Sequence, residues 1–267
     1  SSSVRPKSSR AEYRDDFGLT EEERATFRAW VAAGAPEGDP ALPPLRPTVP
    51  AGTLDRVDVR LELPAPYTPK PPRGSTDDNR CFVLDWPLDR DTYIRGFSVI
   101  PGNRSIVHHL IIALVTGNDA AEATARDARD PEPGFDCNGG IGGVAITTFI
   151  GGGLGTSQLP EGYGVKVPRG AKILLNIHYS TSHTRERVPS DRTAIAFRLE
   201  PTGKPLASII VTNVAWLVGD AMHVAAGDPD AVYYYRYRPK LFTGGKRVLI
   251  HAAAPHMHHF GSKFVLG

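Results

Sequence analysis

Apolar and polar residues alternate along much of the chain after residue 57, as in the run Val59-Arg60-Leu61-Glu62. Because successive side chains of a β-strand point to opposite faces of the sheet, this alternation predicts half-buried strands. Segments with this pattern, or with short apolar runs, are 58–63, 81–84, 92–100, 107–115, 144–150, 172–179, 193–199, 208–214, 232–237 and 247–252. No long helical pattern interrupts them, so the sequence predicts an all-β fold, an antiparallel β-sandwich of the jelly-roll type.

The N-terminal region has a different pattern, that of a short helix. Thr20 and Glu23 have the spacing of a capping box, in which each side chain accepts a hydrogen bond from the backbone N–H of the other residue. An apolar stripe at helical spacing follows, made of Phe27, Trp30 and Val31. Gly34 and Pro36 then mark the end of the helix. The pattern predicts a short amphipathic helix.

Segment 19–36 also resembles the last helix of a bacterial c-type cytochrome module. Such a module attaches haem through Cys-x-x-Cys-His, a motif that these 267 residues lack. Two interpretations remain open. Either a haem-binding part precedes residue 1, which would make a c-type cytochrome module a partner of this chain, or the likeness is that of a generic capped helix.

A proline-rich segment, residues 38–50, predicts an extended and semi-rigid linker after the helix. We therefore expect three parts. Residues 1–50 form the capped helix and the linker, residues 51–202 form a first jelly-roll domain, and residues 203–267 form the beginning of a second one.

Composition excludes some classes of partner. Lys and Arg number 31 against 29 for Asp and Glu, a net charge of +2 with mixed signs, so no nucleic-acid partner is expected. The 27 glycines and 24 prolines fit many short strands joined by turns. No apolar run approaches the roughly 18 residues of a membrane span, and residues 1–6 lack the apolar centre of a signal peptide. We expect a soluble mature chain.

The two cysteines, Cys81 and Cys137, leave two possibilities open. A disulfide between them would close a loop of roughly sixty residues, contribute about 4 kcal/mol in the chain-entropy model and imply an oxidising compartment. Two buried free thiols in a cytosolic protein are the alternative.

Nine histidines include three elements that suggest metal binding. His256 and His258 would share one face of an extended strand and can hold one ion between them, while His259 points away. His108 and His109 are neighbours, and in a regular strand they would face opposite sides. Both can bind one ion only if the strand twists locally or ends there.

The third element is His178, which shares one strand face with Asn176 and Ser180. This polar stripe fits a site, but it also fits an ordinary solvent-facing sheet. Together the histidines can form a three-imidazole site and a separate two-imidazole site. Imidazole suits copper, zinc, iron and nickel alike. A hydrolytic zinc site would add a Glu or Asp, and none flanks these histidines in the sequence.

Five motifs in order resemble the copper type II, ascorbate-dependent monooxygenases, whose animal members hydroxylate peptidylglycine and dopamine. The likeness extends from about Asp55 to the end of the sequence. The residues around Pro255 resemble those of the bacterial branch of the family. The motifs are Cys81-Phe82-Val83-Leu84, Val107-His108-His109-Leu110, Leu159-Pro160-Glu161-Gly162-Tyr163-Gly164, Asn176-Ile177-His178-Tyr179 and Pro255-His256-Met257-His258-His259-Phe260-Gly261.

The resemblance implies two successive jelly rolls that hold two copper ions. His108, His109 and His178 match the ligands of the electron-supplying copper, and His256 and His258 match catalytic ligands of the copper that binds dioxygen. It further implies a small-molecule or peptide substrate and an external reductant such as ascorbate or a cytochrome. Pairing of Cys81 with Cys137 in a disulfide, and a periplasmic or secreted location, follow from the same resemblance.

Three departures from the family pattern limit the likeness. The family's third ligand at the oxygen-side copper is a Met well after the His-x-His, but the sequence ends at Gly267, so we expect a truncated second domain. Ala254 stands where peptide-amidating members have an Arg, which argues against peptidylglycine as substrate. Asn176 replaces a Gln of the animal members. The alternative function is a non-catalytic copper-binding or electron-transfer protein associated with a haem domain.

Overall fold

The structure is a computed structural model of the chain, and it describes most residues between 19 and 265. The described residues are 19–39, 54–137, 148–153, 155–184, 187–208, 211–213, 215–216, 221–225, 227–228, 231–251, 253 and 264–265. The chain divides into two compact units, Ser1–Val49 with Arg247–Gly267 and Pro50–Lys246, which are described separately.

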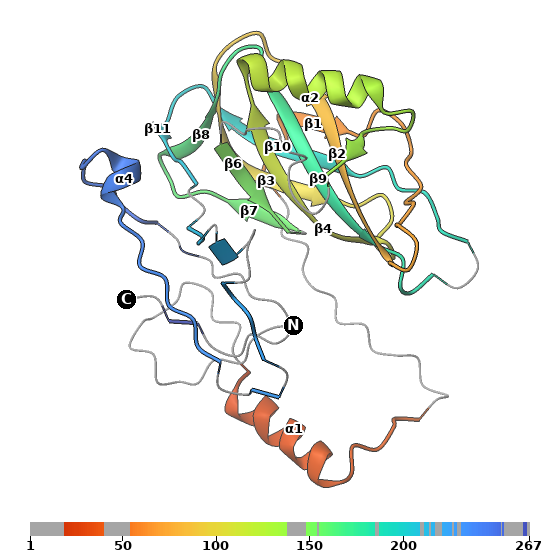
Figure 1. Cartoon of the computed structure of the whole chain (residues 1–267). Helices are drawn as coiled ribbons and strands as arrows, with labels where there is room; N and C mark the ends of the chain where they lie inside the picture. Colours follow the sequence, from red (N-terminus) through yellow and green to blue (C-terminus); the bar gives the residue numbers. More distant parts are fainter. Residues whose placement is uncertain are drawn as a thin grey trace. The chain divides into compact units, whose positions relative to one another are not determined.

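Two β-sheets make up the larger unit (Figure 1). The first has the strand order β1-β10-β3-β8-β11, and β7 also pairs with β3. Its strands are β1 (Val59–Glu62), β3 (Thr92–Ile100), β7 (Thr156–Gln158), β8 (Tyr163–Val167), β10 (Ala194–Glu200) and β11 (Lys204–Pro205). The pairs are antiparallel except for the short parallel pair of β8 and β11.

The second sheet has the order β5-β2-β9-β4-β6, with antiparallel pairing throughout. Its strands are β2 (Asp77–Asp85), β4 (Val107–Val115), β5 (Phe135–Asp136), β6 (Thr148–Gly152) and β9 (Lys172–Ser180). The mostly β architecture of two sheets confirms the predicted all-β class.

The main core lies between the two sheets. Alternate residues of each strand point into it, and together they form one apolar cluster. The second sheet contributes side chains such as Phe82, Ile112 and Leu175, and the first contributes Ile94 and Phe197, all almost fully buried. This inner face fixes the register of the long strands, because a slip by one residue would turn the apolar set outward.

Helix α2 (Gly117–Arg129) corrects the expectation that no helix interrupts the strands. It follows β4 and covers part of the outer face of the second sheet, as Figure 1 shows. Its two buried residues are Ala120 and Ala123, which pack with Leu174 of β9 and Val115 of β4. The helix escaped prediction because its apolar side consists of alanines, which give a weak hydrophobic periodicity.

The disulfide between Cys81 and Cys137 is present, with its two Cα atoms 5.7 Å apart. Both cysteines are buried beneath α2 in the same apolar cluster. The bond joins β2 to the residue that follows β5, so it ties the end of the α2 connection to the sheet.

The later strand predictions were wrong where they can be compared with described residues. Residues 232–237 and 247–251 are described and contain no strand. Val232 is 64% exposed and Tyr234 is 88% exposed. An alternating sequence becomes a strand only when a neighbouring strand completes its hydrogen bonds, and none of the described strands pairs with these residues. Parts of 208–214, and residue 252, lie outside the described residues. The one-turn helix α4 spans Lys240–Thr243.

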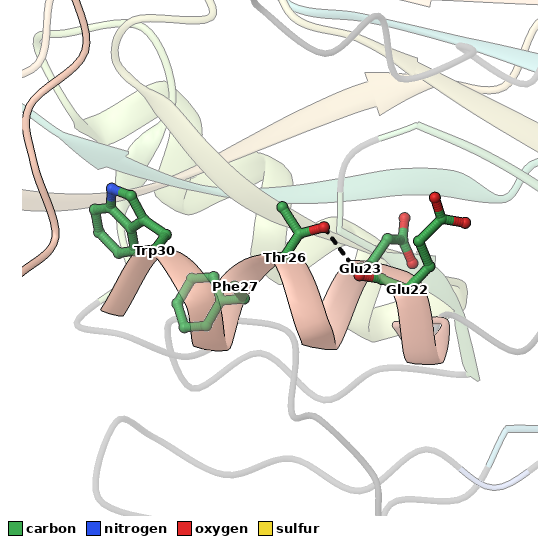
Figure 2. A pocket seen from close by; sticks show the side chains of 5 residues that line it. All are labelled: Glu22, Glu23, Thr26, Phe27 and Trp30. Atoms are coloured by element: carbon green, nitrogen blue, oxygen red, sulfur yellow. Dashed lines mark hydrogen bonds between the residues drawn. The ribbon is translucent and has the colours of Figure 1, made fainter. Parts of the chain in front are cut away.

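Helix α1 (Glu21–Ala32) belongs to the smaller unit. Thr20 Oγ1 accepts a hydrogen bond from the Glu23 N–H at 3.2 Å, and Thr20 N–H donates to the Glu23 carboxylate at 2.7 Å. These bonds lower the pKa of Glu23. A shallow hollow runs along the helix, where Figure 2 shows Phe27 and Trp30 beside Glu22, Glu23 and Thr26. Phe27 is 59% exposed and Trp30 is 44% exposed.

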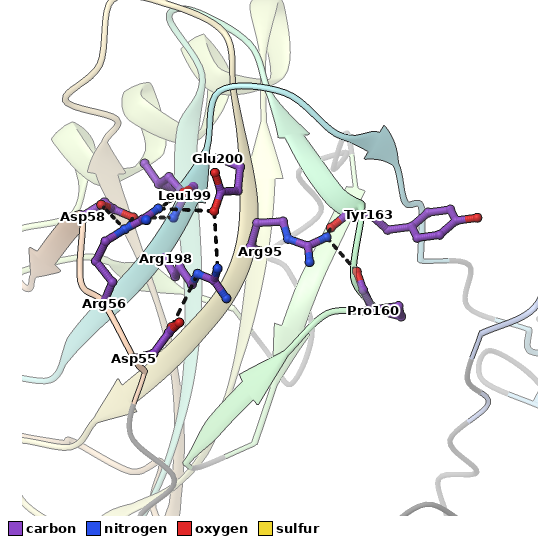
Figure 3. Close-up of polar contacts among 9 residues, drawn as sticks. All are labelled: Asp55, Arg56, Asp58, Arg95, Pro160, Tyr163, Arg198, Leu199 and Glu200. Carbon is purple, nitrogen blue, oxygen red and sulfur yellow. Dashed lines mark hydrogen bonds and ion pairs between the residues drawn. The ribbon is translucent and has the colours of Figure 1, made fainter.

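Arginine side chains bind segments that flank strands of the first sheet, as Figure 3 shows. Arg56 forms an ion pair with Asp58 at 2.8 Å and donates to the Leu199 carbonyl, which joins the segment before β1 to β10.

Arg95 of β3 is buried and donates to the carbonyl oxygens of Pro160 and Tyr163. The 159–164 motif therefore has a structural role here, because the buried guanidinium of Arg95 holds its turn in place.

Candidate metal centre

A β-bulge brings the neighbours His108 and His109 toward one site. In the pairing of β4 with β9, Val107 lies opposite Tyr179 and His109 lies opposite His178. His108 is therefore an extra residue between two paired positions, which is the definition of a bulge. The Ser180 N–H bonds to the Ile106 carbonyl, so the pairing continues past it. This is the local distortion that binding of one ion by both neighbours requires.

The three imidazoles converge through their Nδ1 atoms. Nδ1 of His108 lies 3.1 Å from Nδ1 of His109 and 3.3 Å from Nδ1 of His178. Metal–nitrogen bonds of about 2.0–2.1 Å place neighbouring ligands about 3.3–3.6 Å apart in tetrahedral or trigonal geometry. The spacing is therefore close to what one ion needs. Among the described residues, these three side chains form a group that could hold a metal ion.

The site lies at an open end of the sheet. His108 is exposed, and His109 and His178 are half-buried. Among the described residues, the atoms that converge at this site are imidazole nitrogens, with no carboxylate oxygen or thiolate sulfur among them. An ion held here would face solvent on one side, which leaves room for a further ligand or for an electron donor.

A carboxylate lies behind the site, on the far side of the His178 ring. Asp77 Oδ1 is 3.0 Å from Nε2 of His178. Asp77 is separated from His178 by 101 residues and belongs to β2, the neighbour of β9. The sequence alone does not indicate Asp77, because it does not flank any of the histidines along the chain. The alternation of 77–85 puts Asp77 and Asn79 on one face, but only strand pairing places that face beside His178.

Asn176 lies beside the disulfide and next to His178 on the outer face of the second sheet. It lies two residues before His178 on β9, is 3% exposed, and pairs with Cys81 on β2 and Ile111 on β4. Its amide nitrogen is 3.9 Å from Cys81 Sγ. Along the outer face of β9, His178 is therefore followed by Asn176, which is level with Cys81, and then by Leu174 beneath α2.

On the inner face, one buried carboxylate anchors both histidine strands. Asp191 accepts hydrogen bonds from the Tyr179 hydroxyl at 3.0 Å, from the Asn103 N–H at 2.9 Å and from the Thr193 N–H at 3.1 Å. Tyr179 follows His178 on β9, and the Asn103 carbonyl accepts from the Val107 N–H that starts β4. Burial raises the pKa of the Tyr179 phenol, and Asp191 raises it further. The phenol therefore stays a proton donor to Asp191.

The remaining predicted ligands, His256 and His258, lie outside the described residues. Their pairing at a second copper stays a prediction. His183, His223 and His251 are not part of the three-histidine group.

Among the residues that the structure describes, no helix has the length and apolar character needed to cross a membrane. Compared with models of known protein families and with curated protein sequences, the chain matches none. Function must therefore be inferred from the residues of the site.

Proposed function

We propose that this chain is a copper-dependent monooxygenase of the type II, ascorbate-dependent kind. It would hydroxylate a C–H bond of a small molecule or peptide, using dioxygen and an external electron donor. The observation that carries the proposal is the convergence of three Nδ1 atoms, from His108, His109 and His178, at 3.1 and 3.3 Å. The bulge at His108 supports it, because it is the distortion that shared coordination demands.

The residues divide into two roles. His108, His109 and His178 hold the electron-supplying copper, and His256 and His258 hold the copper at which substrate is hydroxylated. Copper bound to imidazole supplies one-electron redox chemistry and the activation of dioxygen. The strands hold the three imidazoles at fixed spacing, so reduction and oxidation require little rearrangement of the protein.

Several finer features belong to the same proposal. The two sheets would form a jelly roll, followed by the beginning of a second one. The buried disulfide between Cys81 and Cys137 supports a periplasmic or secreted location, because disulfides persist in oxidising compartments. Ascorbate or a c-type cytochrome would serve as reductant, and the exposed edge at His108 gives such a donor access.

That same exposure favours a second candidate, a non-catalytic copper protein that only transfers electrons. A metal within a few ångströms of the surface exchanges electrons readily, and the second copper site is not needed for this function. The two candidates differ in one measurable property, the incorporation of oxygen into a product.

The experiment combines metal loading with isotope labelling. The full chain is loaded with Cu(II), its copper content is measured, and it is incubated under ¹⁸O₂ with ascorbate and a mixture of short peptides and small aromatic amines. Substrate-dependent alcohol containing ¹⁸O supports the monooxygenase. Copper binding and reduction without labelled product supports the electron-transfer protein. A chain that binds zinc tightly and copper weakly contradicts both.

A further inference from the structure

We propose that Asp77 is a positioning residue for the copper ligand His178. Its carboxylate accepts a hydrogen bond from Nε2–H of His178 and so holds the ring in the tautomer that presents Nδ1 to the metal. The inference rests on the proposed metal site, but it assigns a role to a residue that is neither a ligand nor part of any motif in the sequence.

The two nitrogens of His178 point to two different partners. Nε2 lies 3.0 Å from Asp77 Oδ1, and Nδ1 lies 3.3 Å from Nδ1 of His108. A neutral imidazole carries one hydrogen, and a carboxylate can only accept. The hydrogen is therefore on Nε2, which leaves the Nδ1 lone pair free for a metal.

The Asp77 carboxylate is itself held in place. The Thr76 hydroxyl is 3.4 Å from Asp77 Oδ2, on the oxygen that His178 does not use. The Asp77 N–H donates to the Ser75 hydroxyl at 3.0 Å, and Asp77 lies opposite Ser180 in the β2–β9 pairing. Its side chain thus reaches His178 diagonally across two paired strands, a distance that such neighbours span. Strand pairing, rather than a mobile loop, sets this contact.

A simple surface ion pair is the competing explanation. The Asp77 side chain is 49% exposed, and exposed pairs contribute little to stability. The two explanations differ in their effect on the metal. Loss of a surface pair leaves copper binding unchanged, whereas loss of a positioning carboxylate weakens binding at the ligand that it orients.

The chain provides a matched control at the other end of the same strand. Asp85 is on the same face of β2 as Asp77, because eight residues separate them, and it forms an ion pair with Lys172 of β9. Its removal deletes an equivalent charge and an equivalent cross-strand contact far from the histidines. Asp85→Asn therefore reports the effect of losing a carboxylate from β2 without losing a partner of His178.

The experiment measures copper binding by the full chain and three variants, Asp77→Ala, Asp77→Asn and Asp85→Asn. His256 and His258 are replaced by alanine in all of these chains, so that only the three-histidine site is measured. Competition with a chelator of known copper affinity gives the dissociation constant, and pulsed electron paramagnetic resonance of the Cu(II) form counts the imidazoles bound at that site. We expect a roughly 10- to 100-fold weaker copper affinity in Asp77→Ala and a mixture of two and three imidazoles. Asp77→Asn, which keeps an acceptor oxygen without the charge, should lie between Asp77→Ala and the unaltered chain. Asp85→Asn should match the unaltered chain.

Three outcomes distinguish the inference from the function on which it rests. Unchanged affinity with three imidazoles in Asp77→Ala overturns the role of Asp77 and leaves the proposed copper site intact. An equal loss in Asp77→Ala and Asp85→Asn also overturns it, because the effect is then one of general charge. Absence of copper binding by the unaltered chain overturns both proposals. Circular dichroism of the metal-free variants verifies folding, and if Asp77→Ala does not fold, Asp77→Asn provides the comparison.

Discussion

On the outer face of the second sheet, the two ends of the same three strands have different surroundings. At one end, Leu174, Ala113 and Val115 are buried beneath α2 together with the disulfide. At the other end, four to six residues away along β9 and β4, His178 and His109 are only half-buried. Asn176 lies at the boundary.

The difference shows how one face of a sheet can be packed as core at one end and carry a candidate metal site at the other. The inner face is mostly apolar, so the strands remain fixed even where their outer side chains are polar. The covered end adds packing and a covalent link, and the open end contributes side chains that bury little apolar surface. We expect the ends to be separable: changes at the covered end should lower stability, and changes at the open end should alter metal binding.

The largest effect is expected from His178→Ala at the open end. One copper and nearly all turnover should be lost, because two imidazoles remain at the site and the pair at the second copper is untouched. Copper analysis and product formation measure this. His183→Ala is the control, since His183 is exposed and outside the three-histidine group. Unchanged copper content in His178→Ala would refute the assignment.

The next effect is expected at the covered end, from replacing Cys81 and Cys137 together by alanine. The free energy of unfolding should fall by about 4 kcal/mol, the value for a loop of this length. Urea denaturation measures the loss. Copper affinity should change less than about threefold, because Asn176 and its strand pairing stay in place. A loss of copper comparable with that of His178→Ala would mean that the two ends are not separable.

A smaller effect is expected from Leu174→Ala, also at the covered end. Leu174 is fully buried against α2, and its truncation should cost about 3 kcal/mol through lost burial and the cavity left behind. Chemical denaturation gives the value, and copper titration of the same variant gives the comparison. Ser180→Ala, at the opposite end of β9 and half-exposed, should cost much less.

Sequence patterns predicted the central strands of this molecule closely. Segments 92–100 and 107–115 have the predicted bounds, because long apolar strands flanked by Pro, Gly and Asn are distinct in any context. The strand predicted around Tyr234 is absent for the opposite reason. The alternation there is real, but pairing depends on a partner elsewhere in the chain, which no local pattern contains.

The three histidines that converge in the structure were singled out from the sequence, but the residues that support them were not. His108, His109 and His178 were identified from the sequence, and the need for a distortion at His108 followed from the period of a strand. Asp77 and Asp191 were not identified. Each of them contacts a residue of β9 from another segment of the chain. Their spacing along the sequence is not one that indicates a metal site.

The smallest effect, again at the covered end, concerns the buried Arg80, which holds the loop after α2 against β2. It donates to Asp130 at 2.6 Å and to the carbonyl oxygens of Glu132 and Gly134. Burial alone would raise the pKa of Asp130, but hydrogen bonds from Arg80 and from the Glu132 N–H outweigh it and leave that pKa below its ordinary value. Asp130→Asn should therefore lower the free energy of unfolding by about 1.5 kcal/mol at pH 7.

The pH dependence of this loss tests its cause. A carboxyl group whose pKa is lowered by folding stabilises the protein above its unfolded pKa of about 3.9, and this contribution disappears as the pH falls through the folded pKa. The difference between the unaltered chain and Asp130→Asn should consequently shrink between pH 5 and pH 2.5 in urea denaturation. Asp85→Asn, whose exposed ion pair with Lys172 is weak, should differ little at either pH. A difference for Asp130→Asn that stays constant with pH would show that packing of the loop, rather than the charge of Asp130, stabilises the covered end.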